Sequence, residues 1–220
     1  GATNNTIRNL NVVGGANTIG VDGIALSGAT LNTGGADNDG NTISGNTITK
    51  VYRAIYARGL TSPASAATDS LVISNNTLGP AAQGADSIGL DGIYLFGANG
   101  PVVSGNTIRS LTAGATAAGG IYLAQEVAGG SIANNSITNL TSAINATGTN
   151  AITGIYFGST VSNLSVSGNK IQSVSNTLST GAGARWTHAG GGEGVPGMEK
   201  RIDNPLHDRV LIESPLHPGD

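Results

Sequence analysis

The chain has 220 residues, of which 35 are glycine, 10% are charged, 4% are aromatic and none is cysteine. Residues 1–184 carry six basic and seven acidic side chains, so this part is nearly neutral and lacks the basic surface that a nucleic-acid partner requires. No run of 18 apolar residues occurs, so no membrane insertion is predicted, and the absence of cysteine excludes a disulfide scaffold.

A five-residue pattern, Ser-Gly-Asn-Thr-Ile, occurs at residues 44–48 and again at 104–108, with the variant SNNTL at 74–78. It recurs in looser form along the chain, with steps of 30, 30, 29 and 34 residues between its last asparagines. Residues 4–7 (NNTI) are expected to begin the series. The recurring asparagines are Asn46, Asn76, Asn106, Asn135 and Asn169.

A second pattern, Gly-Ile-Tyr-Leu, alternates with the first. Residues 19–29 (IGVDGIALSGA) and 88–98 (IGLDGIYLFGA) agree at eight of eleven positions, which chance does not explain. Both patterns are short, alternate with period two and end in Gly, Asn or Ser, so they predict strands rather than helices. The equivalent isoleucines are Ile24, Ile55, Ile93, Ile121 and Ile155.

Short strands that recur every 30 residues or so cannot bury their apolar faces alone, but stacked repeats can. Each strand then pairs with its equivalent one coil away, at a spacing of about 4.8 Å. The predicted fold is all-β, a right-handed parallel β-helix solenoid of about five to six coils, with the hand that parallel crossovers prefer. Two inward ladders are expected: Ile43, Ile73, Val103, Ile132 and Val166, and Ile48, Leu78, Ile108, Ile137 and Ile171.

The recurring asparagines are expected to form a stacked ladder at one corner of the coil. Asparagine tolerates the left-handed backbone conformation, and its amide can bond the asparagines above and below. The neighbouring Gly45, Gly105 and Gly168 would relax the same bend. The pentapeptide is therefore interpreted as architecture rather than as a ligand or glycan site.

These SGNTI and GIYL repeats resemble those of right-handed parallel β-helix proteins, the pectin-lyase-like superfamily, and especially its bacterial surface and secreted members. The resemblance covers about residues 1–180. It implies the fold and a secreted or cell-surface location in a bacterium. That superfamily holds lyases, hydrolases, adhesins and phage spikes, so the resemblance leaves the activity open.

The repeats occupy residues 1–184, and residues 185–220 have a different composition. This tail holds 10 of the 23 charged residues and all three histidines. The segment from Gly190 to Gly194, followed by VPG at 195–197, indicates a linker. A small cap or anchor, a fusion scar and a segment read in a shifted frame are the alternatives, and we expect low order there.

Three charged residues form the best catalytic candidate, because Asp22, Arg53 and Asp91 each stand two residues before an equivalent isoleucine. Stacking would put Arg53 between two carboxylates about 9.6 Å apart along the axis, close to the separation that inverting glycoside hydrolases use. The alternative, which we favour, is an inter-coil Asp–Arg–Asp ion ladder, because the arginine would hold both carboxylates ionised and leave no general acid. The Asp-pair and His-Gly pattern of polygalacturonases and the acidic calcium cluster of pectate lyases are absent.

A tyrosine follows four of the equivalent isoleucines, which predicts one column of rings on the outer side of a sheet. Such a row could bind the faces of sugar rings. The alternative, which we favour, is a stacked ladder that stabilises the sheet. The candidate ligand-binding residues are Tyr56, Tyr94, Tyr122, Tyr156, Phe96 and Arg58.

Other motifs carry less information. Residues 37–40 (DNDG) match a Ca²⁺-binding loop only in part and are interpreted as a turn, so no cofactor is expected. A hydroxyl column resembles those of ice-binding solenoids, but the row beside it is irregular, and a solvated face is expected. The repeats have no histidine or cysteine, which removes Ser-His-Asp and Cys-His sites. The hydroxyl column is Thr47, Thr77, Thr107 and Ser136.

Two main functional hypotheses follow. The first is a non-catalytic, extracellular structural or adhesin-like module, a fragment of a larger protein. The second is a polysaccharide-binding or polysaccharide-cleaving module, a hydrolase or lyase, that uses the Asp–Arg–Asp group and the tyrosine row; ice or mineral binding is a third. A polysaccharide or another surface protein is the expected partner. Nothing obvious covers the first coil, so we also expect flanking domains or self-association.

Overall fold

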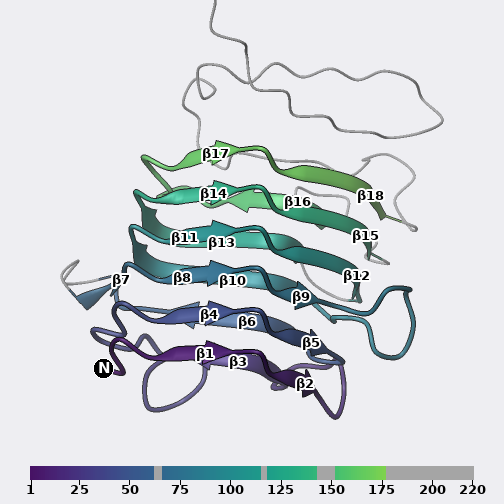
Figure 1. Cartoon of the computed structure of the whole chain (residues 1–220), viewed down its shortest axis with the longest axis horizontal. Coiled ribbons are helices and arrows are strands. Elements are labelled where there is room, and N and C mark those ends of the chain that lie inside the picture. The colour runs from purple at the N-terminus through teal and green to yellow at the C-terminus, as the bar shows by residue number, and fades with distance from the viewer. Residues whose placement is uncertain (62–65, 115–117, 143–151, 177–220) are drawn as a thin grey trace, which may run out of the picture.

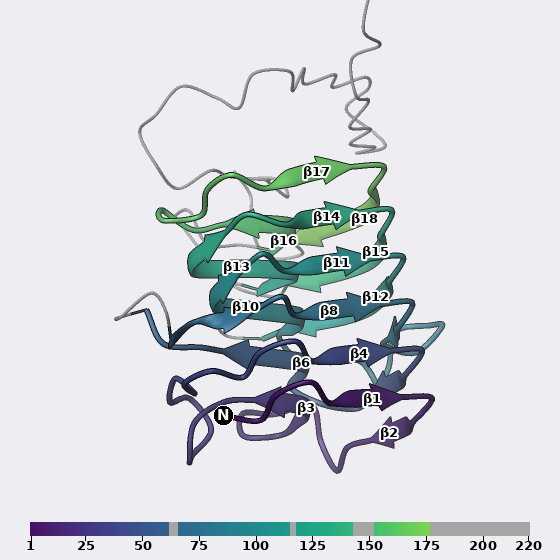
Figure 2. The ribbon, with the colours of Figure 1, turned by 60° about the vertical axis from the view of Figure 1, so that its left-hand side comes forward.

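The computed structural model describes residues 1–61, 66–114, 118–142 and 152–176 as a stack of coils that together build three parallel sheets (Figure 1). Seen from a second side, the strands of each sheet again lie one above the other (Figure 2). The predicted all-β parallel solenoid is confirmed. Among the described residues, no helix is long and apolar enough to cross a membrane. The predicted tail, 185–220, lies outside the described residues.

Sheet A consists of six three-residue strands. The middle residue of each strand points into the coil, and the strands pair in register, so the predicted ladder from Ile43 to Val166 is confirmed and begins one coil earlier, at Ile7. In order, the strands are β1 (Thr6–Arg8), β4 (Thr42–Ser44), β8 (Val72–Ser74), β11 (Val102–Ser104), β14 (Ser131–Ala133) and β17 (Ser165–Ser167).

Sheet B follows sheet A in every coil. Its register confirms the second predicted ladder, from Ile48 to Ile171, and adds Val12 at the N-terminal end. In order, the strands are β2 (Asn11–Val13), β5 (Thr47–Thr49), β9 (Thr77–Leu78), β12 (Thr107–Ala113), β15 (Ser136–Ser142) and β18 (Lys170–Asn176).

Sheet C contains the Gly-Ile-Tyr-Leu pattern, and its isoleucines stack as predicted. The glycine of the pattern has a packing reason: a Cβ on Gly92 would lie 2.5 Å from Cγ2 of Ile108 in sheet B. The strands are β3 (Asp22–Leu26), β6 (Arg53–Arg58), β10 (Asp91–Asn99), β13 (Ala118–Ala128) and β16 (Ile152–Phe157), with β7 (Thr68–Asp69) beside the far end of β10.

The asparagine ladder connects sheets A and B, as predicted. Asn76 Oδ1 accepts hydrogen bonds from the backbone N–H and the Nδ2 of Asn46 at 2.9 and 3.0 Å. Asn76 Nδ2 donates to Asn106 Oδ1 at 3.0 Å and to the carbonyl of Ile43 at 2.9 Å. Because these groups are buried, each coil satisfies the amides of the next one inside the corner.

The left-handed conformation falls one residue before each ladder asparagine, so the prediction that the asparagine itself adopts it was wrong. That earlier residue makes the bend, which leaves the asparagine side chain free to point inward. The position takes only Gly or Asn, the residues that adopt positive φ at least cost. The residues and their φ angles are Gly45 (64°), Asn75 (56°), Gly105 (65°), Asn134 (56°) and Gly168 (63°).

Residues 4–7 do not begin this ladder, so that expectation was also wrong. Asn5 bonds Asn41 at a different corner, with 3.0 Å between Nδ2 and Oδ1. In the first coil the ladder position is occupied by Leu10, whose N–H donates to Asn46 Oδ1 at 3.0 Å. The two sites were confused because Asn-Thr-Ile occurs twice in the second coil, at 41–43 and 46–48.

The first coil is the apolar end of the described stack. Its strands β1, β2 and β3 are the terminal strands of their sheets. The large hydrophobic side chains that stay exposed among the described residues all belong to this coil. They are Leu10 (48% exposed), Val13 (61%), Ile19 (80%) and Leu31 (44%).

Candidate functional site

The Asp–Arg–Asp column lies on sheet C, with Arg53 of β6 in register between Asp22 of β3 and Asp91 of β10. Arg53 Nε donates to Asp22 Oδ1 at 3.0 Å, and its Nη2 donates to Asp22 Oδ2 at 3.5 Å. Nη2 also donates to Asn32 Oδ1 at 3.1 Å. The predicted stacking is therefore confirmed, and the guanidinium is directed toward one of the two aspartates.

Asp91 is the other carboxyl of this column and is 2% exposed. Its Oδ1 accepts a hydrogen bond from the backbone N–H of Gly119 at 3.0 Å. Burial raises the pKa of Asp91 to about 7, although the Gly119 hydrogen bond and the charge of Arg53 oppose the rise. The expectation that Arg53 holds both carboxylates ionised was wrong for Asp91, because Arg53 Nε and Nη2 donate to Asp22 and Asn32, and the desolvation of Asp91 outweighs the lowering effect of the Arg53 charge on its pKa.

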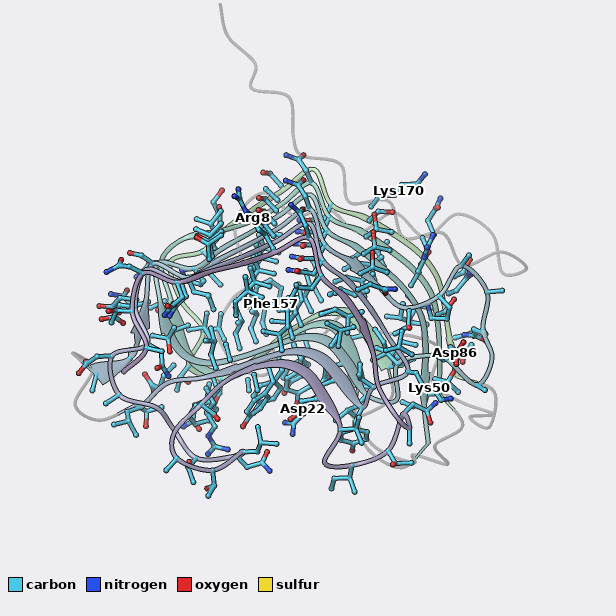
Figure 3. All side chains as sticks on the ribbon, turned by 60° about the horizontal axis from the view of Figure 1, so that its bottom comes forward. Arg8, Asp22, Lys50, Asp86, Phe157 and Lys170 are labelled. Atoms are coloured by element: carbon cyan, nitrogen blue, oxygen red, sulfur yellow. The ribbon has the colours of Figure 1, made fainter. Side chains whose placement is uncertain are left out.

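The column is closed to solvent in this conformation. The side chains of Asp22 and Arg53 are 2% and 10% exposed. Asp22 lies on the outer side of sheet C, where the loop after β3 passes beneath it (Figure 3). Asn32 belongs to that loop and contacts the guanidinium directly. As it stands, the group joins coils and leaves a polysaccharide no route to either carboxyl.

The four tyrosines form one continuous stack on sheet C. The ring centroids of Tyr56 and Tyr94 are 5.1 Å apart, those of Tyr94 and Tyr122 are 5.7 Å apart, and those of Tyr122 and Tyr156 are 4.4 Å apart, with interplanar angles of 9–24°. Burial is the main cause that raises the pKa values of Tyr94 and Tyr122. Each ring therefore presents its face to the next ring and its edge to the outside.

Tyr56 departs from the predicted row of exposed rings, because it is fully buried. Arg53 Cζ lies 4.0 Å from the centroid of its ring, which is a cation–π contact. The Tyr56 hydroxyl has no hydrogen-bond partner among the described residues. The arginine that joins the aspartate column thus also covers the first ring of the tyrosine column.

Arg58 and Phe96 form a separate pair at the end of the row. Arg58 Cζ lies 4.5 Å from the centroid of Phe96, and Arg58 Nε is buried without a partner in the described part of the chain. The register between β10 and β13 shifts after Leu95, so that Phe96 pairs with Gln125. The Arg58–Phe96 pair is therefore in register with Tyr56 and Tyr94 on β6 and β10, and the shift stops its row from continuing onto β13.

Residues 37–40 form a turn that bonds neighbouring coils. Asn38 Oδ1 accepts from the N–H of Ala2 at 2.9 Å, and Asp39 Oδ1 accepts from the N–H of Asp69 at 2.8 Å. Within the described ranges, no three His, Cys, Asp or Glu side chains gather as ligands for a metal ion.

Two hydrogen-bond partners of the aspartate column were not predicted from the sequence. Asn32 comes from the insertion after β3, and Gly119 contributes only its backbone N–H. A side chain in an irregular loop has no repeat to align, and a backbone donor has no sequence signal. The register of the column was predictable, whereas its partners outside the repeat were not.

A model of the family described as right handed beta helix region matches residues 34–190. The match covers well over half of the chain and agrees with the three-sheet stack, so the chain belongs to the right-handed β-helix family. Comparisons with curated proteins and with solved structures gave no match.

Proposed function

We propose that this chain is a non-catalytic structural or adhesin-like β-helix module of a secreted or cell-surface bacterial protein. The observation that carries this proposal is the way in which its distinctive side chains are used. Arg53 bonds Asp22 of the neighbouring coil, and each tyrosine ring stacks on the ring of another coil. The groups that could bind or cleave a sugar are engaged in joining coils.

An extended module of this kind suits a stalk or a display scaffold. Each added coil brings its own ladder asparagine, core isoleucines and sheet hydrogen bonds, so the length can increase without a larger central core. The buried asparagine amides and the isoleucine ladders resist separation of the coils along the axis. Such a scaffold would hold flanking parts of a surface protein at a fixed distance.

A panel of neutral and acidic polysaccharides tests this proposal. We expect no release of reducing ends or unsaturated products, and no difference between the native chain and the Asp91→Asn variant. Release of products by the native chain, lost in Asp91→Asn while the circular dichroism spectrum is retained, would reject it. Asp86→Asn is the matched control, because Asp86 is an exposed aspartate whose carboxylate lies 3.9 Å from Lys50 Nζ.

The pKa of Asp91 supports polysaccharide cleavage as a second candidate function. A carboxyl with a pKa of about 7 is partly protonated near neutral pH, as a general acid must be. The loop that holds Asn32 would have to move away before a substrate could reach it. In the polysaccharide panel, this candidate requires product release that depends on both Asp22 and Asp91.

The apolar first coil gives the module a partner surface. We propose that a flanking domain or a second copy covers Leu10 and Val13, because exposed apolar residues beside three terminal strands favour association. This contact uses Leu10 and Val13 beside β2 of sheet B, whereas Asp22 of the same coil lies on sheet C.

A further inference from the structure

The outer side of sheet A is a regular surface. Its six strands pair without a register shift, and each three-residue strand presents its first and third residues outward. The array therefore repeats at about 4.8 Å along the axis and at about 6.6 Å across it. The outward residues are Thr6, Arg8, Thr42, Ser44, Val72, Ser74, Val102, Ser104, Ser131, Ala133, Ser165 and Ser167.

Eight of these twelve side chains carry a hydroxyl, three are small and apolar, and only Arg8 is charged. No side chain of the eight makes a hydrogen bond to another described residue, so the described part of the chain leaves all eight hydroxyls available to a partner. Arg8 stands at the edge of the array, on the outer side of the first strand (Figure 3).

The other two sheets lack such a surface. On sheet C, the loop that contains Asn32 covers Arg53, and the register shifts after Leu95. On sheet B, the loop residue Gln83 donates to Thr141 Oγ1 at 2.9 Å. In Figure 3 the described loops lie beside these two sheets and away from the outer side of sheet A. Within the described ranges, sheet A is the sheet that combines a constant register with a face that no described loop covers.

The array is also rigid. The residues between its columns, including Ile43, Ile73 and Val103, are fully buried in the core. Serine, threonine and valine have short side chains that lose little rotamer entropy when they are fixed. A surface of this kind can make many weak contacts at once with a partner that is itself rigid and periodic, and their contributions to the binding free energy then add together.

The chemistry of the face selects the partner. It has no aromatic ring to stack on sugars, and apart from Arg8 it has no charge for an acidic polymer. A second copy of the sheet would bury eight hydroxyls, each of which costs about 1–3 kcal/mol where it stays unpaired. Ordered water can offer a donor and an acceptor to every hydroxyl, while the three apolar groups fill the spaces between water molecules.

We propose that the outer face of sheet A binds ice. The ligand is the ordered water of a crystal surface, and the binding residues are the hydroxyl-bearing and small apolar side chains on β4, β8, β11 and β14. This activity is independent of the proposed structural function, since it uses a different sheet.

Thermal hysteresis of the full chain, the gap between the melting and freezing temperatures of an ice crystal, tests the proposal. We expect hysteresis in the native chain and its loss in Ser74→Tyr and Ser104→Tyr, which place bulky rings in the array. Thr77→Tyr and Thr107→Tyr are the matched controls, because they put the same ring on the outer side of sheet B in the same two coils. Circular dichroism of all variants establishes that they fold.

A gain-of-function pair avoids any question of folding. Val72→Thr and Val102→Thr replace two methyl groups of the array with hydroxyls in nearly the same volume, and we expect the hysteresis to be retained or increased. Absence of hysteresis in the folded native chain overturns the proposal. So does an equal loss in the sheet A variants and the sheet B controls. Binding to crystalline cellulose or chitin without hysteresis, abolished by Ser74→Tyr, would identify a polysaccharide face instead and would also overturn it.

Discussion

Replacement of Asp91 by asparagine removes a buried charge while its hydrogen bond is kept. The Oδ1 of an asparagine at this position can still accept from the N–H of Gly119, which lies 3.0 Å from Oδ1 of Asp91. The neutral acid and the amide have nearly the same shape. At pH 4, where Asp91 is protonated in the folded chain, the two proteins are expected to differ in stability by no more than about 1 kcal/mol.

The difference should appear as the pH rises. The pKa of Asp91 is about 7 in the folded chain, against an ordinary value of 3.8, so the folded chain binds the proton more tightly than the unfolded chain. That stabilisation is complete below pH 4 and is lost as the pH rises to about 7. At ~1.4 kcal/mol per pKa unit, the loss amounts to about 4 kcal/mol. Asp91→Asn should avoid it and be the more stable protein at pH 8.

Urea denaturation at pH 4, 6 and 8, followed by circular dichroism, measures this directly. The native chain should lose stability across the series relative to Asp91→Asn, while Asp86→Asn, at an exposed position, should follow the native profile. If Asp91→Asn and the native chain show parallel profiles, or if the variant is the less stable one at pH 8, the account of Asp91 as an underpaired buried carboxyl is wrong.

Three further predictions concern the ladders and the first coil. Asn76→Ala should lower the free energy of unfolding, measured by urea denaturation, by about 3–6 kcal/mol, because it leaves buried polar groups of Asn46 and its neighbours unpaired. Asn75→Gly should be neutral or slightly stabilising, because residue 75 has a positive φ of 56°. Equal effects of the two substitutions would contradict the corner geometry. Tyr122→Leu should lower stability by about 1–3 kcal/mol through two lost ring contacts and leave polysaccharide retention in affinity electrophoresis unchanged; lost retention with full stability would favour a sugar-binding row. Val13→Lys should reduce the mass seen by sedimentation if the apolar end self-associates, and an unchanged oligomer would place the contact elsewhere.

The sequence predicted the repeated part of the structure with most success where one residue type recurs at one position. The isoleucine ladders and the asparagine corner follow from spacing alone, because in-register stacking brings equal positions of successive coils together. The error at residues 4–7 shows the limit of this approach: two corners of a coil can carry the same three letters, and only the pairing of β1 with β4 distinguishes them.

The candidate site was predicted less completely. The order Asp22, Arg53, Asp91 followed from the repeat. The repeat did not predict which neighbouring side chains accept hydrogen bonds from the guanidinium of Arg53. These hydrogen bonds depend on Asn32, which lies in a loop without a counterpart in other coils. The burial of Tyr56 has the same origin, because it is set by the side chain of Arg53 above the ring rather than by the strand pattern.

The central claim is that equivalent residues of successive coils lie directly above one another. Spin labels on cysteines at Ser44 and Ser74, at Ser44 and Ser104, and at Ser44 and Ser167 test it, because these pairs span one, two and four coils on the outer side of sheet A. The account predicts that the separation measured by electron paramagnetic resonance grows by about 4.8 Å per coil. Separations that do not increase in this order, or that place the first pair several coils apart, would contradict it.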